Sequence, residues 1–369
     1  MPPIVIGFPV EKACQYVVNI LKEKGEKESE ITKVMTGGPD GDLGSNEILI
    51  SKDNILAIID GSGVLYDPDG INRKELRRLA RARQMAENFN KDHLSPRGFF
   101  VHINDKNIRI SGGERVISGL EFRNTFHLNP KFKADLFVPC GGRPASININ
   151  NWREFLDEEG TPRFKYIVEG ANLFITQEAR IRLEERGVII YKDASANKGG
   201  VTSSSMEVFA SLALNDAEYD EYMCVKNGQI PEFRKQFVAE ILKLIKANAS
   251  AEFEVIWKEH QEKNIKMSIL SDLVSTKINK ISDAIYASKL YLDQPLFKNI
   301  IQCCCPEILI DTVGFKKIIE RVPRSYLIAI FASRLASNYV YKYGLDADEV
   351  DFHNFIKTFQ VTQKDGKPV

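Results

Sequence analysis

The chain has 369 residues, 43% of them hydrophobic, so it can bury a sizeable core and form two or three domains. Its 50 Lys and Arg residues balance 50 Asp and Glu residues, which gives no electrostatic reason to expect nucleic-acid or membrane-surface partners. The longest apolar run, residues 326–332, is far shorter than the ~20 residues of a membrane-spanning helix, and the N-terminus lacks the features of a signal or transit peptide. We therefore expect an intracellular, soluble protein of the cytoplasm or the mitochondrion.

The N-terminal part of the sequence predicts the start of an α/β domain. Apolar residues at helical spacing predict an amphipathic helix over residues 10–24. A short buried strand is expected over 31–35, followed by a glycine-rich loop over 36–46 that leads into a helix. A second strand, 55–59, ends at Asp60. This order of strand, glycine loop, helix and strand is typical of the parallel crossover with which a dinucleotide-binding domain begins.

Strands and helices continue to alternate up to about residue 216. Asn72 and Glu75 have the side chains of a capping box, which predicts a helix that runs to about Glu87. Hairpins are expected near residues 98–130, where glycines separate short alternating runs. Further buried strands are expected at 135–138, 166–168 and 188–191, and a helix is expected at 176–186. The pattern predicts an α/β fold with a doubly wound parallel sheet of the Rossmann type.

The character of the sequence changes after about residue 217. Apolar residues then recur with a period close to that of a helix, glycines are sparse and prolines separate the segments. We therefore expect three parts. They are a leading helix and linker over 1–30, a dinucleotide-binding domain over 31–216 and a helical C-terminal region over 217–369.

The glycine-rich loop and Asp60 form the first candidate site. A dinucleotide's pyrophosphate needs close approach of the backbone and a helix N-terminus to receive it. Gly41 and Gly44 occupy the second and third glycine positions of the dinucleotide fingerprint, with Asp42 between them, and Gly38 stands one place before the first position. A tight turn without a ligand is the alternative interpretation of this loop.

Asp60 stands where an acidic residue accepts a hydrogen bond from the adenosine ribose 2′-OH. The segment 61–63 carries no Arg or Lys that could neutralise a 2′-phosphate, which favours NAD over NADP. An aspartate that merely caps a loop at the end of a strand is the alternative.

Three further polar or glycine-rich loops, 139–142, 169–172 and 193–200, each follow a predicted strand. Ligands of open α/β sheets bind outside the carboxyl ends of the strands, so these loops should line one crevice. Each could instead be an ordinary turn, but three in succession favour the crevice.

Several long blocks of the sequence are distinctive. They lie at residues 36–48, 60–71, 122–127, 138–144, 168–179, 192–208 and 306–314. Together they resemble the cofactor domain of large, NAD-specific glutamate dehydrogenases of the fungal type, from about residue 31 to the C-terminus. Members of that family oxidatively deaminate L-glutamate to 2-oxoglutarate and ammonia and transfer a hydride to NAD. The resemblance implies that this chain supplies the cofactor domain of such an enzyme, which would form a homo-oligomer.

The resemblance also implies a role for each candidate residue. The cofactor's pyrophosphate would be held by Gly38, Gly41 and Gly44, and its adenosine ribose by Asp60. Asn172 and Asn197 correspond to asparagines that lie beside the nicotinamide. Ser204 corresponds to a serine that helps to bind the distal carboxylate of the substrate, although many such serines only cap a helix.

No catalytic residue is expected within this chain. Deamination of an amino acid needs a lysine with a lowered pKa and a carboxylate that transfers protons. In the resembled family these residues lie in a substrate domain that precedes the cofactor domain, whereas only about thirty residues precede the first strand predicted here. Lys198 is the one candidate substitute, and we do not expect it to act as the base.

Three functional hypotheses follow. In the first, the chain is part of a longer glutamate dehydrogenase. In the second, it is a free-standing NAD-binding or regulatory module without catalysis. In the third, it belongs to a dehydrogenase of another amino acid, because Ser204 alone does not fix the substrate.

Metal sites and disulfides are not expected. The five histidines form no HExxH or other paired motif, and the scattered cysteines show no framework spacing. Cys303, Cys304 and Cys305 are adjacent, but no other ligand pair stands beside them, so we interpret them as structural. The basic run 73–83 is interpreted as the solvated face of a helix, with an anion or subunit contact as the alternative.

Overall fold

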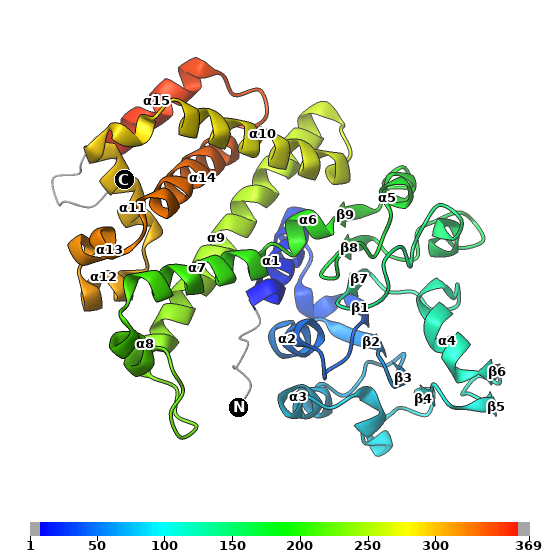
Figure 1. Cartoon of the computed structure of the whole chain (residues 1–369). Coiled ribbons are helices and arrows are strands. Elements are labelled where there is room, and N and C mark those ends of the chain that lie inside the picture. The colour runs from blue at the N-terminus through cyan, green and yellow to red at the C-terminus, as the bar shows by residue number, and fades with distance from the viewer. Residues whose placement is uncertain (1–7, 361–369) are drawn as a thin grey trace. The chain divides into compact units, whose positions relative to one another are not determined.

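A seven-stranded sheet forms the centre of the N-terminal part of the protein (Figure 1). The computed structural model describes residues 8–360. The strands of this sheet are β1 (Thr32–Thr36), β2 (Asn54–Ile59), β3 (Gly63–Tyr66), β4 (Phe99–His102), β7 (Leu136–Pro139), β8 (Tyr166–Val168) and β9 (Ile189–Tyr191). Their spatial order is β4-β3-β2-β1-β7-β8-β9.

The middle of the sheet is parallel, and the direction in which successive strands are added to it reverses between β1 and β7. β1 pairs in parallel with β2 on one side and with β7 on the other, and β8 and β9 continue the parallel run beyond β7. β3 pairs antiparallel with β2, and β4 antiparallel with β3. The expected doubly wound α/β fold is therefore confirmed, with two antiparallel pairings at one edge. The switch between β1 and β7 opens a crevice at the carboxyl ends of these strands.

Helices cover both faces of this sheet. Those of the N-terminal part are α1 (Phe8–Lys24), α2 (Asp42–Ile50), α3 (Arg73–Ala82), α4 (Gly119–Thr125), α5 (Gln177–Glu184) and α6 (Asp193–Ala196). In Figure 1, α1, α2 and α3 lie on one side of the sheet and α4 and α5 on the other. Short 3₁₀ helices lie at Glu28–Glu30, Ala86–Asn88, Lys91–His93, Phe126–Leu128 and Trp152–Phe155.

The end of α3 differs from the sequence prediction. The N-terminal cap is as predicted, because the Asn72 side chain accepts a hydrogen bond from the Glu75 backbone N–H at 3.1 Å. The helix nevertheless ends at Ala82, and Arg83 adopts a left-handed conformation with φ 52°. The prediction that the helix reaches Glu87 is wrong. The backbone N–H of Ala86, which a longer helix would use internally, instead donates to Asp60 Oδ2 at 2.7 Å.

The region near residues 98–130 contains β4 and a separate hairpin. In the hairpin, β5 (Lys106–Arg109) pairs antiparallel with β6 (Arg115–Ser118). α4 follows directly, with the Ser118 side chain accepting a hydrogen bond from the Glu121 backbone N–H. This insertion packs α4 against β3 and β4, at the antiparallel edge of the sheet.

One face of the sheet is an aromatic core. Phe137 on β7 lies with its ring centroid 5.2 Å from Phe164, 5.5 Å from Phe155 and 5.9 Å from Phe174. These rings are almost completely buried. They fix the segments before and after β8 against the sheet, since tilted and edge-on aromatic pairs add to the free energy gained by burial.

The other face contains a buried charge network centred on Lys33 of β1. Its Nζ lies 2.7 Å from Glu47 Oε1 on α2 and 2.8 Å from Asp53 Oδ2, just before β2, and donates to Ser51 at 2.9 Å. Cys14 of α1 donates its thiol hydrogen to Glu47 Oε2 at 2.9 Å. Burial lowers the pKa of Lys33, but the two carboxylates outweigh this effect and raise it above its usual value. The network therefore ties β1 to α1, to α2 and to the connection that enters β2.

The rest of the chain is helical. Two compact units can be distinguished, one comprising residues up to Gly199 together with Lys266–Ser268 and the other the remainder from Gly200. The boundary lies at the start of α7, earlier than the expected position at 216/217. The helices are α7 (Gly199–Ala213), α8 (Asp216–Tyr222), α9 (Glu232–Lys263), α10 (Met267–Ala287), α11 (Gln294–Cys304), α12 (Glu307–Val313), α13 (Phe315–Arg321), α14 (Arg324–Tyr343) and α15 (Glu349–Gln360), with a 3₁₀ helix at Leu290–Leu292.

The longest helix, α9, shows why this part of the sequence folds as helices. Phe233, Phe237, Ile241 and Ile245 are buried on it at intervals of four residues, which places them on one face.

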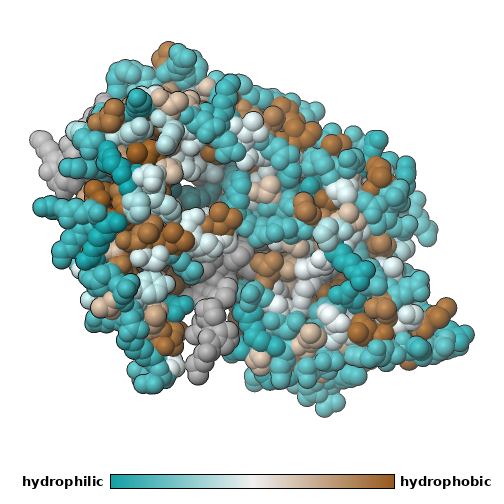
Figure 2. Space-filling view, viewed as in Figure 1, coloured by the Kyte–Doolittle hydropathy of each residue, from teal (hydrophilic) through white to brown (hydrophobic). Residues whose placement is uncertain are grey.

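None of the helices within residues 8–360 is long and apolar enough to cross a bilayer. The face shown in Figure 2 is mainly hydrophilic, with hydrophobic residues scattered over it.

Replacing Lys33 with Met should strongly destabilise the N-terminal unit. The substitution removes the cation that lies between two buried carboxylates, and Asp53 then keeps its longer ion pair with Arg73, at 3.4 Å. Breaking a comparable buried network costs about 3–5 kcal/mol. Urea denaturation should show this loss in the free energy of unfolding. The matched control is Lys27→Met, which breaks a pair with Glu30 whose side chains are 77% and 63% exposed and should have little effect. Equal effects of the two substitutions would contradict the importance of the network.

Candidate functional site

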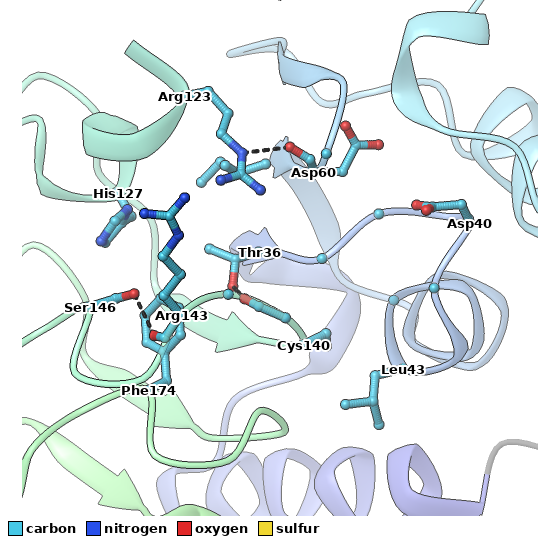
Figure 3. Close-up of a pocket in the computed structure, with 18 of the residues that line it drawn as sticks. Thr36, Asp40, Leu43, Asp60, Arg123, His127, Cys140, Arg143, Ser146 and Phe174 are labelled. Atoms are coloured by element: carbon cyan, nitrogen blue, oxygen red, sulfur yellow. Dashed lines mark hydrogen bonds between the residues drawn. The ribbon is translucent and has the colours of Figure 1, made fainter. Parts of the chain in front are cut away.

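A pocket of about 600 Å³ lies at the carboxyl ends of β1, β2 and β7 (Figure 3). Its walls come from the glycine loop between β1 and α2, from the loops after β2 and β7, from α4 and from the segment after β8. This is the switch point of the sheet, the usual position for a ligand in an open α/β fold. Five of the residues singled out in the sequence line it: Gly38, Gly41, Asp42, Gly44 and Asp60.

The glycines of the loop after β1 allow close backbone approaches. Gly37 has φ 89°, and a Cβ atom on it would lie 2.8 Å from the Cys140 carbonyl carbon and the Gly141 nitrogen. A Cβ atom on Gly44 would lie 2.2 Å from the Gly38 carbonyl oxygen. Both positions therefore require glycine for the packing of the protein itself. Gly37 was not among the predicted residues, although it directly precedes one of them.

Gly41 is different, because it is not constrained by the protein. A Cβ atom there would meet only the Gly38 carbonyl oxygen, at 3.7 Å. Gly41 is also the N-cap residue of α2, with φ −78°, and no side chain caps this helix. The backbone N–H groups of the first turn of α2 consequently face the pocket without a side-chain acceptor, which is the arrangement that receives a phosphate group.

Asp60 is a buried carboxylate that organises its surroundings. Only 2% of its surface is exposed. Oδ1 accepts hydrogen bonds from the Ser62 N–H at 2.9 Å, the Ser62 hydroxyl at 2.6 Å and the Gly63 N–H at 3.2 Å, and Oδ2 accepts from the Ala86 N–H at 2.7 Å. Gly38 lies against the same carboxylate, since a Cβ atom on Gly38 would be 2.5 Å from Asp60 Oδ2.

Two arginines in the pocket were missed in the sequence analysis. Arg123 extends from α4, and its Nε donates to the Asp60 carbonyl oxygen at 2.7 Å. Arg143 lies in the loop after β7, and its guanidinium group lies on the same side of the pocket as that of Arg123 (Figure 3). Both residues fall within distinctive sequence blocks, 122–127 and 138–144, but sequence spacing does not reveal that they line the same pocket as Asp60. Their positive charges face a site that also contains Asp40 and Asp42.

The basic run 73–83 touches the glycine loop at one point. Arg83 Nη1 lies 2.9 Å from Asp42 Oδ1 at the start of α2. Both side chains are well exposed, so this pair contributes little to stability. Its position does matter, because Arg83 offsets an acidic charge beside the uncapped N-terminus of α2.

His127 lines the pocket and carries a buried polar atom without a hydrogen-bond partner among residues 8–360. Its side chain is buried against Phe137 and Phe174, with ring centroids 6.5 Å and 5.7 Å away. Nε2 is buried and has no hydrogen-bond partner among residues 8–360. Burial, followed by the charges of Arg163 and Arg123, lowers the pKa of His127 to about 4. The ring is therefore neutral near pH 7, and its unpaired Nε2 is a buried polar atom of the kind that usually has a partner.

The two candidate asparagines come together, although they are not among the residues that line the pocket. Asn172 follows β8 and Asn197 follows α6, and Asn197 Nδ2 donates to Asn172 Oδ1 at 2.7 Å. Lys198, half-buried, occupies the turn between α6 and α7. Ser204 belongs to the second unit, where its exposed hydroxyl donates to the Gly200 carbonyl oxygen of its own helix, α7, at 2.9 Å.

The cysteine triplet lies in the helical unit at the end of α11. Burial raises the pKa of Cys303, Cys304 and Cys305, to about 12 for Cys304, so these thiols stay protonated and are weak nucleophiles. All six cysteines are free thiols. Within residues 8–360 no group of three or more His, Cys, Asp or Glu side chains is arranged to hold a metal ion.

The chain matches known proteins over most of its length. The family model described as Glutamate/Leucine/Phenylalanine/Valine dehydrogenase matches residues 12–264. "Glutamate dehydrogenase 2" of Dictyostelium discoideum is 52% identical over 98% of this chain and 34% of its own length. The "NAD-specific glutamate dehydrogenase" of Neurospora crassa is 48% identical over 95% of this chain and 33% of its own length. The chain thus spans about a third of the length of these relatives.

Solved structures also match. A crystal structure of Plasmodium falciparum glutamate dehydrogenase aligns with 71% of this chain and 47% of its own, with a TM-score of 0.47 and 16% sequence identity.

Replacing His127 with Asn should flatten the dependence of stability on pH. The pKa of His127 is about 4 in the folded protein and about 6.5 when unfolded, so the unfolded state binds more protons between these values. The wild type should therefore lose up to about 3 kcal/mol of unfolding free energy through this group as the pH falls from 6.5 to 4. Asn cannot titrate and should not show this part of the loss. Urea denaturation at several pH values measures it.

The exposed histidine His93 provides the control for this experiment. His93→Asn makes the same substitution at the surface, and the pH dependence of His127→Asn is compared with that of this variant and of the wild type. A His127→Asn variant with the wild-type slope between pH 4 and 6.5 would show that His127 is not held in a neutral, desolvated state.

Proposed function

Because the chain belongs to the Glutamate/Leucine/Phenylalanine/Valine dehydrogenase family, we propose that it provides the NAD-binding part of an NAD-specific glutamate dehydrogenase. The full-length enzyme would oxidatively deaminate L-glutamate to 2-oxoglutarate and ammonia. The observation that carries this proposal is the pocket at the switch point, where the uncapped N-terminus of α2 faces the loop that Asp60 organises. The relatives named as NAD-specific glutamate dehydrogenases support the choice of cofactor and substrate.

The residues of the pocket fit a dinucleotide. The pyrophosphate would lie over Gly38, Gly41 and Gly44 at the start of α2, with the helix dipole and Arg83 offsetting the acidic charges of the loop. Asp60 would accept a hydrogen bond from the adenosine ribose. His127 Nε2, buried and unpaired among residues 8–360, supports a polar ligand in the same pocket. Bound NAD would supply the hydride acceptor for the substrate.

The charge of Asp60 supports NAD over NADP. A 2′-phosphate placed beside this buried carboxylate would meet direct repulsion, whereas a 2′-hydroxyl can donate to it. Arg123 reaches the backbone of Asp60 from α4, so its guanidinium group is a countercharge beside the proposed ribose position. Discrimination between the two cofactors would thus depend on the carboxylate of Asp60 outweighing Arg123.

The nicotinamide side of the cofactor would be held by Asn172 and Asn197, and Ser204 would bind the distal carboxylate of glutamate. The contact between the two asparagines supports their joint role. The lysine and carboxylate that act on the substrate are proposed to lie in sequence that the longer relatives contain and this chain does not match. Lys198 is not assigned as the base.

We further propose a homo-oligomeric enzyme of the cytoplasm or the mitochondrion. The exposed apolar side chains of Ile117 and Leu120, which lie on β6 and at the start of α4, support a contact with another subunit. The six free thiols suit either reducing compartment.

Calorimetric titration of the 369-residue chain tests this proposal directly. NAD should bind and NADP should bind at least about tenfold more weakly, because a 2′-phosphate would lie beside the Asp60 carboxylate. The same sample should form no NADH when glutamate is added. Turnover with glutamate would show that this chain contains its own catalytic base, and the absence of NAD binding would exclude the proposed function. NAD binding without any glutamate dehydrogenase activity in the corresponding full-length protein would favour a non-catalytic NAD-binding module.

Gly41→Ala should weaken NAD binding without destabilising the protein. The added methyl group has room within the protein, because its nearest neighbour would be 3.7 Å away, but it projects where the pyrophosphate must approach the backbone. We expect the dissociation constant for NAD to rise at least about tenfold. The free energy of unfolding without NAD should stay within about 1 kcal/mol of the wild type, since Ala is compatible with φ −78°. Unchanged NAD affinity in a folded variant would remove the glycine loop from the proposed site.

A further inference from the structure

Three buried charged side chains join the segments that carry Asn172 and Asn197. Glu169 directly follows β8, Arg180 lies on α5 and Asp193 begins α6. Arg180 Nε lies 2.7 Å from Glu169 Oε1, and its Nη2 lies 2.8 Å from Glu169 Oε2 and 3.2 Å from Asp193 Oδ1. The guanidinium group of Arg180 therefore binds both carboxylates, and its contact with Glu169 is bidentate.

Asp193 connects directly to the backbone beside both asparagines. Its Oδ2 accepts a hydrogen bond from the Leu173 N–H at 2.7 Å, next to Asn172. Its carbonyl oxygen accepts from the Asn197 N–H at 2.9 Å. The position of Asp193 therefore sets the separation of the two segments, and the contact between the asparagine side chains at 2.7 Å follows from it.

The backbone at Leu173 is held in an unfavourable conformation. Leu173 has φ 57°, a left-handed conformation that is unfavourable for a residue with a Cβ atom. Its side chain is 64% exposed, so burial of the side chain does not compensate for this cost. The hydrogen bonds that hold it there are those to Asp193 and from the Ala145 N–H to the Leu173 carbonyl oxygen, the latter at 2.8 Å. This conformation turns the chain immediately after Asn172.

Stability alone does not account for these three charges. Burial raises the pKa of Glu169 to about 7, in opposition to its two hydrogen bonds with Arg180, which shows how costly desolvation is at this position. Buried ion networks are often no more stable than apolar residues of the same volume, and in some proteins they specify one geometry instead. None of the three side chains lines the pocket, so they act through the residues that they hold.

We propose that Glu169, Arg180 and Asp193 form a positioning unit that holds Asn172 and Asn197 at the spacing needed to bind the nicotinamide carboxamide of NAD. This inference rests on the proposed function. According to this inference, Arg180 affects the binding of the nicotinamide half of the cofactor, whereas the glycine loop and Asp60 bind the ADP-ribose half. The two halves can therefore be separated by experiment, because ADP-ribose lacks the nicotinamide.

Arg180→Lys tests the proposal, since an ammonium group keeps the charge but cannot form the bidentate contact and reach Asp193 as well. Calorimetric titrations of the 369-residue chain with NAD and with ADP-ribose should give the wild type a preference for NAD. In Arg180→Lys the affinity for ADP-ribose should stay unchanged, whereas the affinity for NAD should fall about tenfold, the equivalent of about one hydrogen bond. Asn172→Ala should show the same pattern.

Arg182→Lys is the matched control. Arg182 lies on the same helix, in an exposed pair with Glu185 at 3.1 Å, and its replacement should change neither affinity. If Arg180→Lys does not fold, Asp193→Asn provides the second test, because it keeps the shape of the side chain and removes one carboxylate oxygen. It should likewise reduce the affinity for NAD alone.

The outcomes separate the two proposals. A wild type that binds neither NAD nor ADP-ribose contradicts the proposed function. A wild type that binds both equally well contradicts the positioning unit, because the asparagines then add nothing to the binding of the nicotinamide. Folded Arg180→Lys or Asp193→Asn proteins that retain the preference for NAD, or that lose both ligands to the same extent, also contradict it.

Discussion

The close approach of two backbone segments, Gly37–Gly38 after β1 and Cys140–Gly141 after β7, is the constraint on which the pocket depends. Side chains at Gly37 or Gly44 would overlap neighbouring backbone, so the loop after β1 can fold tightly only because these positions are glycine. The Thr36 hydroxyl donates to the Gly141 carbonyl oxygen, and the Cys140 N–H donates to the Thr36 carbonyl oxygen at 2.7 Å. The start of α2 is thereby fixed at the switch point, where its free N–H groups can serve an anion.

Buried charge networks support this pocket region from two sides. Lys33 lies between Glu47 and Asp53 and holds α2 against β1. Arg180 lies between Glu169 and Asp193 and holds the loops after β8 and β9. Each network places one cation between two carboxylates, and each joins a strand to a helix or loop that follows it. A buried cation of this kind penalises any arrangement that separates it from its partners, so the networks restrict how the loops can be placed.

The parallel strands and their helices could be predicted from the sequence, because apolar runs and glycine loops follow one another in the order that a doubly wound sheet requires. β3 was missed, since Gly63–Tyr66 is short and follows immediately on the turn after Asp60. The pocket residues that the sequence analysis singled out are those that a motif or a strand end marks, namely the glycine loop, Asp60 and the loop 139–142. Arg123 approaches Asp60 from α4, and Arg180 approaches Glu169 and Asp193 from α5, and such contacts depend on tertiary structure.

Asp60 illustrates how one residue can serve the fold and a ligand together. A carboxylate offers about four acceptor positions, and here Oδ1 accepts three hydrogen bonds whereas Oδ2 accepts one, from Ala86. The remaining capacity therefore lies on Oδ2, the oxygen that faces Gly38. A side chain on Gly38 would stand 2.5 Å from this oxygen and close off the approach to it. The need for glycine at position 38 and the capacity of Asp60 to accept a ribose hydroxyl thus have the same structural cause.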